Sequence, residues 1–442
     1  MRFLVVAVVV GALACVAGCT LGAPAVTSAG EGEGEGAGEG EGEGALAPGT
    51  PTYATDIQPL LAQHCTMCHQ AGGIAPFPLT SYDDAFANKD AMADATGRRI
   101  MPPWYAAQGC TEYAPDQSLS DDEIALIANW FHAGAPEGDK SLEKDPAPPP
   151  LVSPEPDVVL AMSEPYTQQA EPDEYRCFPL AWTKDTASFI TGFRVTPGTA
   201  AVVHHIIATI VPPSDVQALL DQDDADPGPG FTCGAGGGMA SVLSSTGGMA
   251  FVWAPGADGE RFPEGTGIAI EPGSYIQLQI HYNSSTAGAQ PDQTTVGFAT
   301  ADTVAHPARF MPWMDPRWVV NMNIPAGESA VDFTFAADPT RFIGGPFTVF
   351  DVMMHMHNLG AGGDVKLLPK NHSDDCLLDL SSWSFHWQLS YPLAATRHVE
   401  VGDQLQIHCQ FNNQGGGTDV HFGEGTADEM CLAFLYVTPD SP

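Results

Sequence analysis

Tyr275-Ile276-Gln277-Leu278-Gln279-Ile280-His281-Tyr282 is a β-rich run, and runs of this kind decide the fold of most of the chain. Similar runs stand at 188–195 and 347–352, and Gly, Pro, Asn and Asp separate them. Many short strands at this spacing predict β-sandwiches or jelly rolls. The region is long for one sandwich, so we expect two all-β domains, 158–300 and 301–442, with a boundary between strand clusters near 301–307.

The region before these strands has a helical pattern instead. Ser120 stands at a capping position, acidic residues follow it, and the apolar residues after them recur at helical spacing as far as Phe131. We therefore expect a small all-α domain over residues 52–144. Five prolines between Asp145 and Pro154 indicate a linker, residues 145–157.

Cys65-Thr66-Met67-Cys68-His69 is the most informative motif of this helical region. Cysteines spaced C-x-x-C can form thioethers with the vinyl groups of haem, and the adjoining His69 then ligates the iron. We therefore expect a cytochrome c-like domain with one covalently bound haem c. The proline-stiffened loop 99–104 resembles the loop that presents the axial Met in many small cytochromes c, which implies Met101 as the distal ligand. A thioether in that position favours Fe(II) and raises the potential. His64 and His132 are alternatives, as is a core role for Met101.

The first 19 residues have the pattern of an export signal, one Arg followed by an apolar run and small residues. Val16-Ala17-Gly18-Cys19 resembles a bacterial lipobox, which predicts lipidation of Cys19; secretion with simple cleavage is the alternative. Residues 20–51 hold a Glu- and Gly-rich run that predicts an extended tether. We expect an exported bacterial lipoprotein, at an outer membrane and facing the periplasm or the cell surface.

The charge and the cysteines limit the partners and the compartment. The net charge of −38, from 16 basic and 54 acidic residues, argues against nucleic acid or an anionic bilayer as partner. The expected contact with a membrane is the lipid anchor alone. Outside the signal and the haem motif, the remaining cysteines number six, which allows three disulfides in an oxidising compartment. The spacing leaves their pairing open.

Two histidine patterns in the strand region have the residue types of metal sites. His355 and His357 stand at positions i and i+2, which share one face of a strand, so both can bind one ion while Met356 points away. A thioether such as Met430 beside two imidazoles is a soft donor set that suits Cu(I).

The second pattern combines the adjacent His204 and His205 with His281 at the end of a strand. Neighbouring residues face opposite ways on a regular strand, so His204 and His205 can reach one ion only where the strand bends or ends. Spacing alone does not separate copper from zinc, because imidazole serves both metals.

From Glu174 to Tyr436 the chain resembles the copper type II monooxygenases, which include peptidylglycine α-hydroxylating and dopamine β-monooxygenases. The matching segments occur in family order: Tyr175-Arg176-Cys177, Val203-His204-His205, Phe231-Thr232-Cys233, Leu278-Gln279-Ile280-His281-Tyr282, His355-Met356-His357-Asn358-Leu359-Gly360 and Asp428-Glu429-Met430-Cys431.

This resemblance implies two copper ions. It implies that His204, His205 and His281 bind the copper that transfers electrons, and that His355, His357 and Met430 bind the catalytic copper, where oxygen reacts. It also implies the disulfides Cys177–Cys233 and Cys409–Cys431. Cys110 and Cys376 are left, and a bridge between them would tie the haem domain to the second sandwich.

The implied activity is hydroxylation of a C–H bond of a small organic substrate by O₂. Ascorbate or a periplasmic donor would supply electrons, and the fused haem would pass them to the copper at His204, His205 and His281. The peptide-amidating members grip a substrate carboxylate with an Arg and a Tyr, where this chain has Met353 and Phe434. We therefore expect an apolar or aromatic substrate instead of a peptide carboxylate.

Two other classes of function fit the same residues. A non-enzymatic lipoprotein would use them to pass electrons or to handle copper. A binding module would use the sandwiches alone, with the cytochrome as a companion domain. Two coppers and one haem per chain would exclude the binding module, and substrate-dependent O₂ consumption would separate an enzyme from a carrier.

Overall fold

The computed structural model describes residues 46–144, 153–233, 247–255, 258–285, 287–423 and 427–440. Residues Gly49–Pro442 form one compact unit. The predicted signal, the lipidation site Cys19, the Glu-rich run and linker residues 145–152 lie outside the described residues. None of the described helices is long and apolar enough to cross a membrane.

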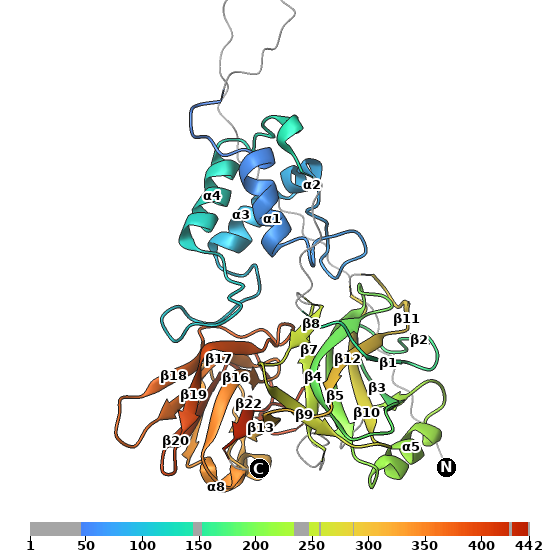
Figure 1. Ribbon diagram of the computed structural model, residues 1–442. Coiled ribbons are helices and arrows are strands. Elements are labelled where there is room, and N and C mark those ends of the chain that lie inside the picture. The colour runs from blue at the N-terminus through green and yellow to red at the C-terminus, as the bar shows by residue number, and fades with distance from the viewer. Residues whose placement is uncertain are drawn as a thin grey trace, which may run out of the picture. The chain divides into compact units, whose positions relative to one another are not determined.

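The helical part contains short helices that pack on one another around a small core (Figure 1). Ser120 caps the longest of them and forms a capping box with Glu123, which confirms the predicted helix start. Ile127 and Trp130 of that helix pack with Tyr53 in the core. The elements are η1 Tyr53–Ile57, α1 Gln58–His64, α2 Tyr82–Ala87, α3 Lys89–Gly97, α4 Asp121–His132 and η2 Lys140–Leu142.

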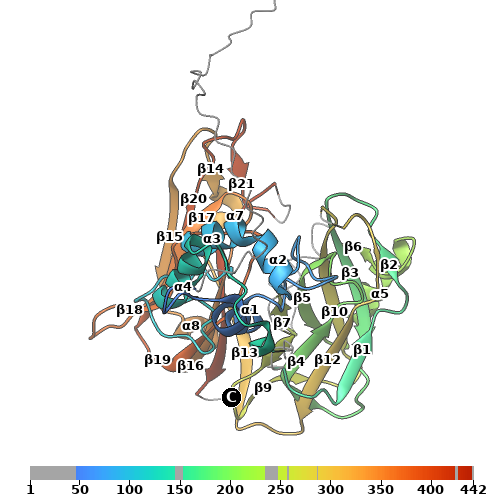
Figure 2. The same ribbon diagram turned by 90° about the horizontal axis from the view of Figure 1, so that it is seen from above.

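The first sandwich pairs a five-stranded sheet, β6-β3-β10-β5-β7, with a sheet that includes β1-β12-β4-β9 (Figure 2). Ile276, Leu278 and Ile280 of β10 face the core, so His281 lies on the opposite face. The elements are β1 Val158–Ala161, β2 Tyr166–Thr167, β3 Asp173–Ala181, β4 Ser188–Thr196, β5 Val203–Val211, α5 Val216–Ala225, β6 Phe231–Thr232, β7 Met249–Trp253, β8 Gly259–Arg261, β9 Thr266–Ile270, β10 Tyr275–Asn283, β11 Pro291–Asp292 and β12 Thr295–Ala301.

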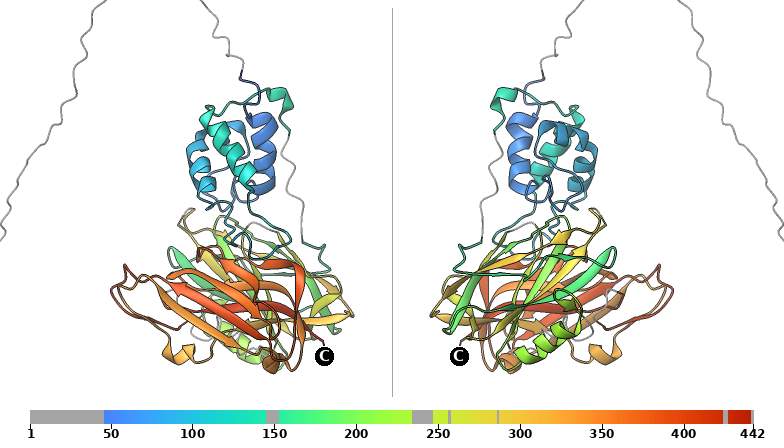
Figure 3. Two further views of the ribbon diagram at one scale, coloured as in Figure 1. Left: turned by 90° about the vertical axis from the view of Figure 1, so that its left-hand side faces the viewer. Right: turned by 90° about the vertical axis from the view of Figure 1, so that its right-hand side faces the viewer.

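The second sandwich pairs β13-β22-β16-β19 with the four-stranded sheet β15-β20-β17-β18 (Figure 3). The prediction of β-sandwiches for the C-terminal region is confirmed. The elements are β13 His306–Trp313, α7 Trp318–Asn321, β14 Asn323–Ile324, β15 Val331–Ala337, α8 Thr340–Ile343, β16 Phe347–His355, β17 Gly360–Leu368, β18 Asp375–Leu380, β19 Tyr391–Val399, β20 Gln404–Phe411, β21 Val420–His421 and β22 Leu432–Pro439.

Strand β13 joins the two sandwiches through one continuous nine-stranded sheet. Its residues His306–Ala308 pair with β9 in parallel, and Arg309–Trp313 pair with β22 in antiparallel (Figure 1). The sequence pattern gave no sign of this continuity, because a strand that changes partner along its length has the same local composition as any other strand.

Among the residues that the structure describes, three disulfides form: Cys110–Cys376, Cys177–Cys233 and Cys409–Cys431. The second and third are the pairings implied by the resemblance. The first joins Cys110, in the segment between α3 and α4, to Cys376 of the second sandwich, which is the bridge that we considered for the two remaining cysteines.

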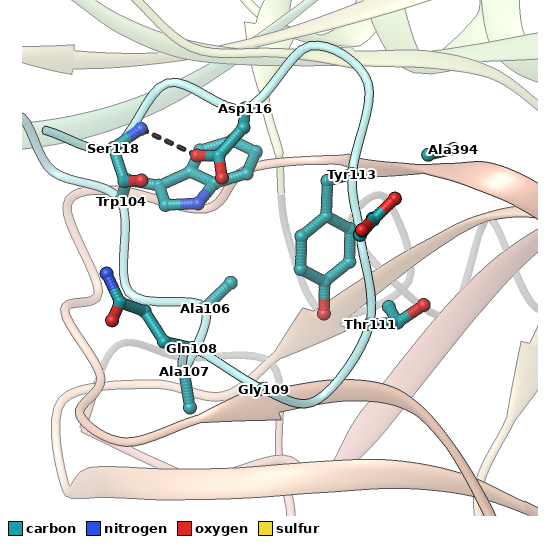
Figure 4. A pocket seen from close by; sticks show the side chains of 11 residues that line it. Trp104, Ala106, Ala107, Gln108, Gly109, Thr111, Tyr113, Asp116, Ser118 and Ala394 are labelled. Carbon is teal, nitrogen blue, oxygen red and sulfur yellow. Dashed lines mark hydrogen bonds between the residues drawn. The ribbon is translucent and has the colours of Figure 1, made fainter. Parts of the chain in front are cut away.

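The segment Trp104–Ala114, which we call the strap, lies along β18 and β19 around this disulfide. Ala106 forms an isolated bridge with Leu380 of β18, and Tyr113 forms one with Leu393 of β19, so the strap pairs with an edge strand of each sheet of the second sandwich. A cavity of about 410 Å³ lies within the strap, lined by Trp104, Tyr113 and small or polar residues (Figure 4). The strap therefore attaches the helical part to the second sandwich by backbone pairing as well as by a covalent bond.

A pair of carboxyl groups is brought together where β8 and β16 lie. Asp351 is buried and accepts a hydrogen bond of 2.6 Å from the Ser390 hydroxyl, while its Oδ2 has no partner. Burial raises the pKa of Asp351 to about 6. Burial, and then the charge of Asp351, raise the pKa of Glu260. The folded protein therefore disfavours the ionised pair.

Replacing this carboxyl by an amide, Asp351→Asn, is expected to stabilise the protein at pH 8 but not at pH 4. A folded-state pKa raised from 3.8 to about 6 makes the folded protein lose stability as pH rises through that window. The gain at pH 8 should be about 3 kcal/mol, measured by thermal unfolding. Asp332→Asn is the control, because His408 lowers the pKa of Asp332 and its loss should not stabilise. An equal gain at both pH values would contradict the prediction.

Candidate metal centres

The first candidate site lies on β5 and β10 of the first sandwich. His281 pairs with His205, and Tyr282 pairs with Val203, so His204 is an extra residue without a partner in the register. This β-bulge bends the strand and lets adjacent side chains turn to the same side. The bulge supplies the bend that His204 and His205 need to reach one ion.

The three imidazoles converge through their Nδ1 atoms. The Nδ1 of His205 lies 3.3 Å from the Nδ1 of His204 and 3.3 Å from that of His281. The donor atoms of the three side chains all lie within 4.8 Å of one another. Nitrogens bound about 2.0 Å from one ion in a plane lie ~3.5 Å apart. The spacing therefore fits a single metal ion held by three histidines.

The outer nitrogens of two of these rings have their own partners. The Nε2 of His281 lies 2.8 Å from the Oδ1 of Asp173, and the ring stacks on Tyr175 at 4.4 Å. The Nε2 of His204 lies 3.1 Å from the Nδ1 of His386. With Nδ1 directed to an ion, each Nε2–H donates to its partner, which fixes the tautomer and the ring orientation.

All three imidazoles are held neutral, as metal ligands must be. Burial, and then neighbouring histidines, lower the pKa of His204 to about 3 and that of His205 well below its ordinary value. Burial also lowers the pKa of His281. The hydrogen bond from His281 lowers the pKa of Asp173 to about 2, so this carboxylate stays ionised and accepts the Nε2 proton.

The second candidate site begins where β16 ends. His355 is the last residue of the strand, His357 follows two residues later, and their rings lie 5.1 Å apart. Met356 between them is fully buried in the sandwich core, as expected. The Nδ1 of His355 donates to Gln388 Oε1 at 2.5 Å, and the Nδ1 of His357 donates to the Asp428 carbonyl at 3.0 Å. The other ring nitrogen of each histidine, Nε2, is the atom by which it would bind an ion.

Glu429 places the segment that carries Met430 against this pair. Its buried carboxyl group accepts backbone hydrogen bonds from His357 at 2.8 Å, from Leu359 at 2.5 Å and from Met430 at 3.3 Å. Burial raises its pKa to about 7 in spite of these donors. Met430 is buried in an apolar cluster that also contains Ile207 of the first sandwich.

The C-x-x-C-H motif lies between helices α1 and α2. Cys65 and Cys68 are free thiols, partly buried, and burial raises their pKa values to about 12 and about 11. The Nδ1 of His69 lies 2.9 Å from the Phe77 carbonyl, which leaves its Nε2 for a metal. Met101 lines a cavity of about 240 Å³ whose lining does not include the motif.

Several contacts of these sites are with residues for which sequence reasoning indicated no role. Tyr175 and Glu429 lie inside segments that carried the resemblance, so their position was a signal. His386 stood among many unassigned histidines. Asp173 and Gln388 gave no signal, because their contacts depend on how distant strands and loops come together.

The fold and the two histidine sets define a class: a metalloprotein of two β-sandwiches with buried imidazole and thioether donors. Two family models match the sequence of this chain. The N-terminal domain of the copper type II ascorbate-dependent monooxygenases matches residues 160–289, and the C-terminal domain matches residues 317–441. Together the two models cover more than half of the chain. The chain therefore belongs to the copper type II ascorbate-dependent monooxygenase family. The family and the histidine-rich site identify copper as the metal.

Two relatives carry the same printed description, DBH-like monooxygenase protein 1. The human protein is 23% identical over 364 residues, or 73% of this chain and 56% of that protein. The mouse protein is 22% identical over 203 residues, or 42% of this chain and 32% of that protein. The chain thus matches about half or less of their length. Among solved structures, the match to the infectious bursal disease virus VP2 subviral particle is 10% identical, covers 66% of this chain and 74% of that chain, and has a TM-score of 0.17.

Proposed function

We propose that this protein is a copper-dependent monooxygenase that hydroxylates a C–H bond of a small organic substrate with O₂. The observation that carries the proposal is the convergence of three buried, neutral imidazoles in a chain of this family. His204, His205 and His281 would hold one copper ion. His355, His357 and Met430 would hold the catalytic one.

The chain's residues fit these two ions differently. Three Nδ1 donors at the first site make an all-imidazole set, which suits copper in both oxidation states. Two Nε2 donors and a thioether make a softer set at the second site, which suits Cu(I). When bound, the first ion would hold and release single electrons, and the second would bind and activate O₂ for attack on the substrate.

The surroundings of Met430 favour an apolar substrate. Met353 and Phe434 pair across β16 and β22 and share one buried cluster with Met430 and Met249. These two residues stand where the peptide-amidating members have groups that grip a carboxylate. An apolar wall cannot compensate the desolvation of a charged carboxylate. We therefore propose an apolar or aromatic small molecule as the substrate class.

We further propose that the helical part, residues 52–144, carries one haem c. Cys65 and Cys68 are unpaired thiols suited to thioether bonds, and the Phe77 carbonyl holds the Nδ1 proton of His69 so that Nε2 faces a metal. Met101 is the proposed distal ligand. The haem would supply single electrons to the copper at His204, His205 and His281, in place of or beside ascorbate.

Export completes the proposal. Three disulfides join six cysteines, which is typical of an oxidising compartment outside the cytosol. Lipidation at Cys19 and localisation at an outer membrane remain predictions from the sequence.

The function is tested with the full chain loaded with copper. We expect two copper ions per chain, and O₂ consumption that depends on an added substrate and yields a product with one new hydroxyl group. A panel of amines, phenols and peptides searches for the substrate. Copper binding and electron transfer without hydroxylated product from any compound would instead support the carrier or copper-handling function.

Loss of the two thiols, Cys65→Ser with Cys68→Ser, is expected to remove the covalent haem. The thioether bonds need both sulfurs, so haem staining after denaturation should fall to background while copper stays at two per chain. Thr66→Ala, between the two cysteines, is the control and should retain haem. Covalent haem in the double variant, or none in the parent, would overturn the haem assignment and leave the copper sites unaffected.

A further inference from the structure

The segment Ser384–Gln388 of the second sandwich lies against both histidine sets. It is a compact turn, in which the Trp387 N–H donates to the Ser384 carbonyl at 3.0 Å and the Gln388 side chain donates to the Phe385 carbonyl at 3.0 Å. These hydrogen bonds within the segment stabilise its turn conformation.

One contact of this segment crosses from the second sandwich to the first. The Nδ1 of His386 lies 3.1 Å from the Nε2 of His204, and the two rings meet edge to face at 4.8 Å. His281 has its outer partner, Asp173, within the first sandwich. His204 therefore differs, because the partner for its outer nitrogen comes from the other sandwich.

The same segment also reaches the second histidine set. Gln388 is buried and accepts the proton of His355 Nδ1 at 2.5 Å. The ring of Phe385 lies 5.8 Å from that of His357 and 6.0 Å from that of His281. One short segment thus contacts ligands of both proposed copper ions.

The strap braces the segment from its other side. The hydroxyl of Tyr105 is hydrogen-bonded to the Ser384 side chain, and the Tyr105 backbone N–H donates to the Tyr391 hydroxyl. Trp104 packs on Tyr391 with ring centres 4.6 Å apart. The position of His386 is therefore set by contacts on both of its flanks.

We propose that His386 is a positioning residue of the first copper site, which the second sandwich completes by holding His204. The His204 Nε2–H donates to His386 Nδ1, which selects the tautomer that presents Nδ1 to copper and fixes the ring. The inference rests on the proposed function for the presence of copper. It adds that the affinity and the geometry of the first site depend on a residue of the other sandwich.

The test uses the full chain and copper alone, without substrate. His386→Leu removes the acceptor, His386→Gln keeps a side-chain oxygen that can accept from His204, and His398→Leu removes a distant exposed histidine of the same sandwich as a control. Because His386 is exposed, these changes should leave the thermal unfolding midpoint unaltered. The readouts are copper affinity, by competition with a Cu(I)-binding dye, and the electron paramagnetic resonance spectrum of the Cu(II) protein.

We expect His386→Leu to lower the affinity for one of the two copper ions about 10- to 100-fold and to change one component of the Cu(II) spectrum. His386→Gln should restore most of both properties, and His398→Leu should match the parent. Parent-like affinity and spectrum in His386→Leu would overturn the inference while the proposed function stands. Failure of the parent to bind two copper ions would overturn the proposed function, and this inference with it.

Discussion

Met430→Ile is expected to abolish hydroxylation while the protein stays folded. Isoleucine fills a similar volume in the apolar cluster around Met430 but has no sulfur to donate to copper. The loss of a group that is only hydrogen-bonded to a metal ligand typically lowers metal affinity or activity by up to about 100-fold. The loss of a direct ligand should have a larger effect. Product formation and copper content per chain measure the effect, and we expect the copper content to fall toward one.

Met353→Ile is the matched control for this change. Met353 lies in the same buried cluster but is not among the proposed copper ligands. A volume-conserving swap there should cost less than about 1.5 kcal/mol of stability and keep the copper content at two. If Met430→Ile retained two copper ions and the activity of the parent, Met430 would not be a ligand.

Glu429→Ala is expected to have the largest effect on stability and on the second site together. The buried carboxyl group accepts backbone hydrogen bonds from His357, Leu359 and Met430. Each buried N–H left without an acceptor costs about 1–3 kcal/mol, so the loss of an acceptor for three donors should lower the free energy of unfolding by roughly 3–9 kcal/mol. The segment that carries Met430 would also lose its attachment to His357, so the affinity of the second site for copper should fall.

Glu429→Gln separates the two roles of that carboxyl group. The amide keeps one acceptor oxygen but turns an NH₂ group toward the remaining N–H donors, so we expect an intermediate loss. Chemical unfolding and copper content are measured for the three proteins side by side. An Ala variant as stable as the parent would show that water replaces the carboxyl group and that the hydrogen bonds contribute little.

Much of the local structure was predictable because it depends on neighbours in the sequence. The capping box of Ser120 and Glu123 marks a helix start by residues three apart. The run 275–282 predicted β10, whose bounds are Tyr275–Asn283. The need for a bend at His204 and His205 also followed from strand geometry, although only the register of β5 against β10 shows that a bulge supplies it.

The hydrogen-bond partners of the proposed ligands could not be predicted from local sequence. Asp173 precedes His281 by 108 residues, and His386 follows His204 by 182. Such pairs meet only after strands have taken their register and loops have closed over them. One residue of register shift would move each of these side chains to the other face of its sheet.

The sequence by itself determined the residue types that can do chemistry here: the C-x-x-C-H motif of Cys65, Cys68 and His69, the two histidine sets, and the strands that carry those sets. Local spacing and composition suffice for these features. Only the tertiary structure decided that β13 runs one sheet through both sandwiches, that the strap is bonded to β18 through Cys110–Cys376, and that His386 meets His204. These are contacts between distant segments, and they arise from register and packing, to which no single stretch of sequence contributes alone.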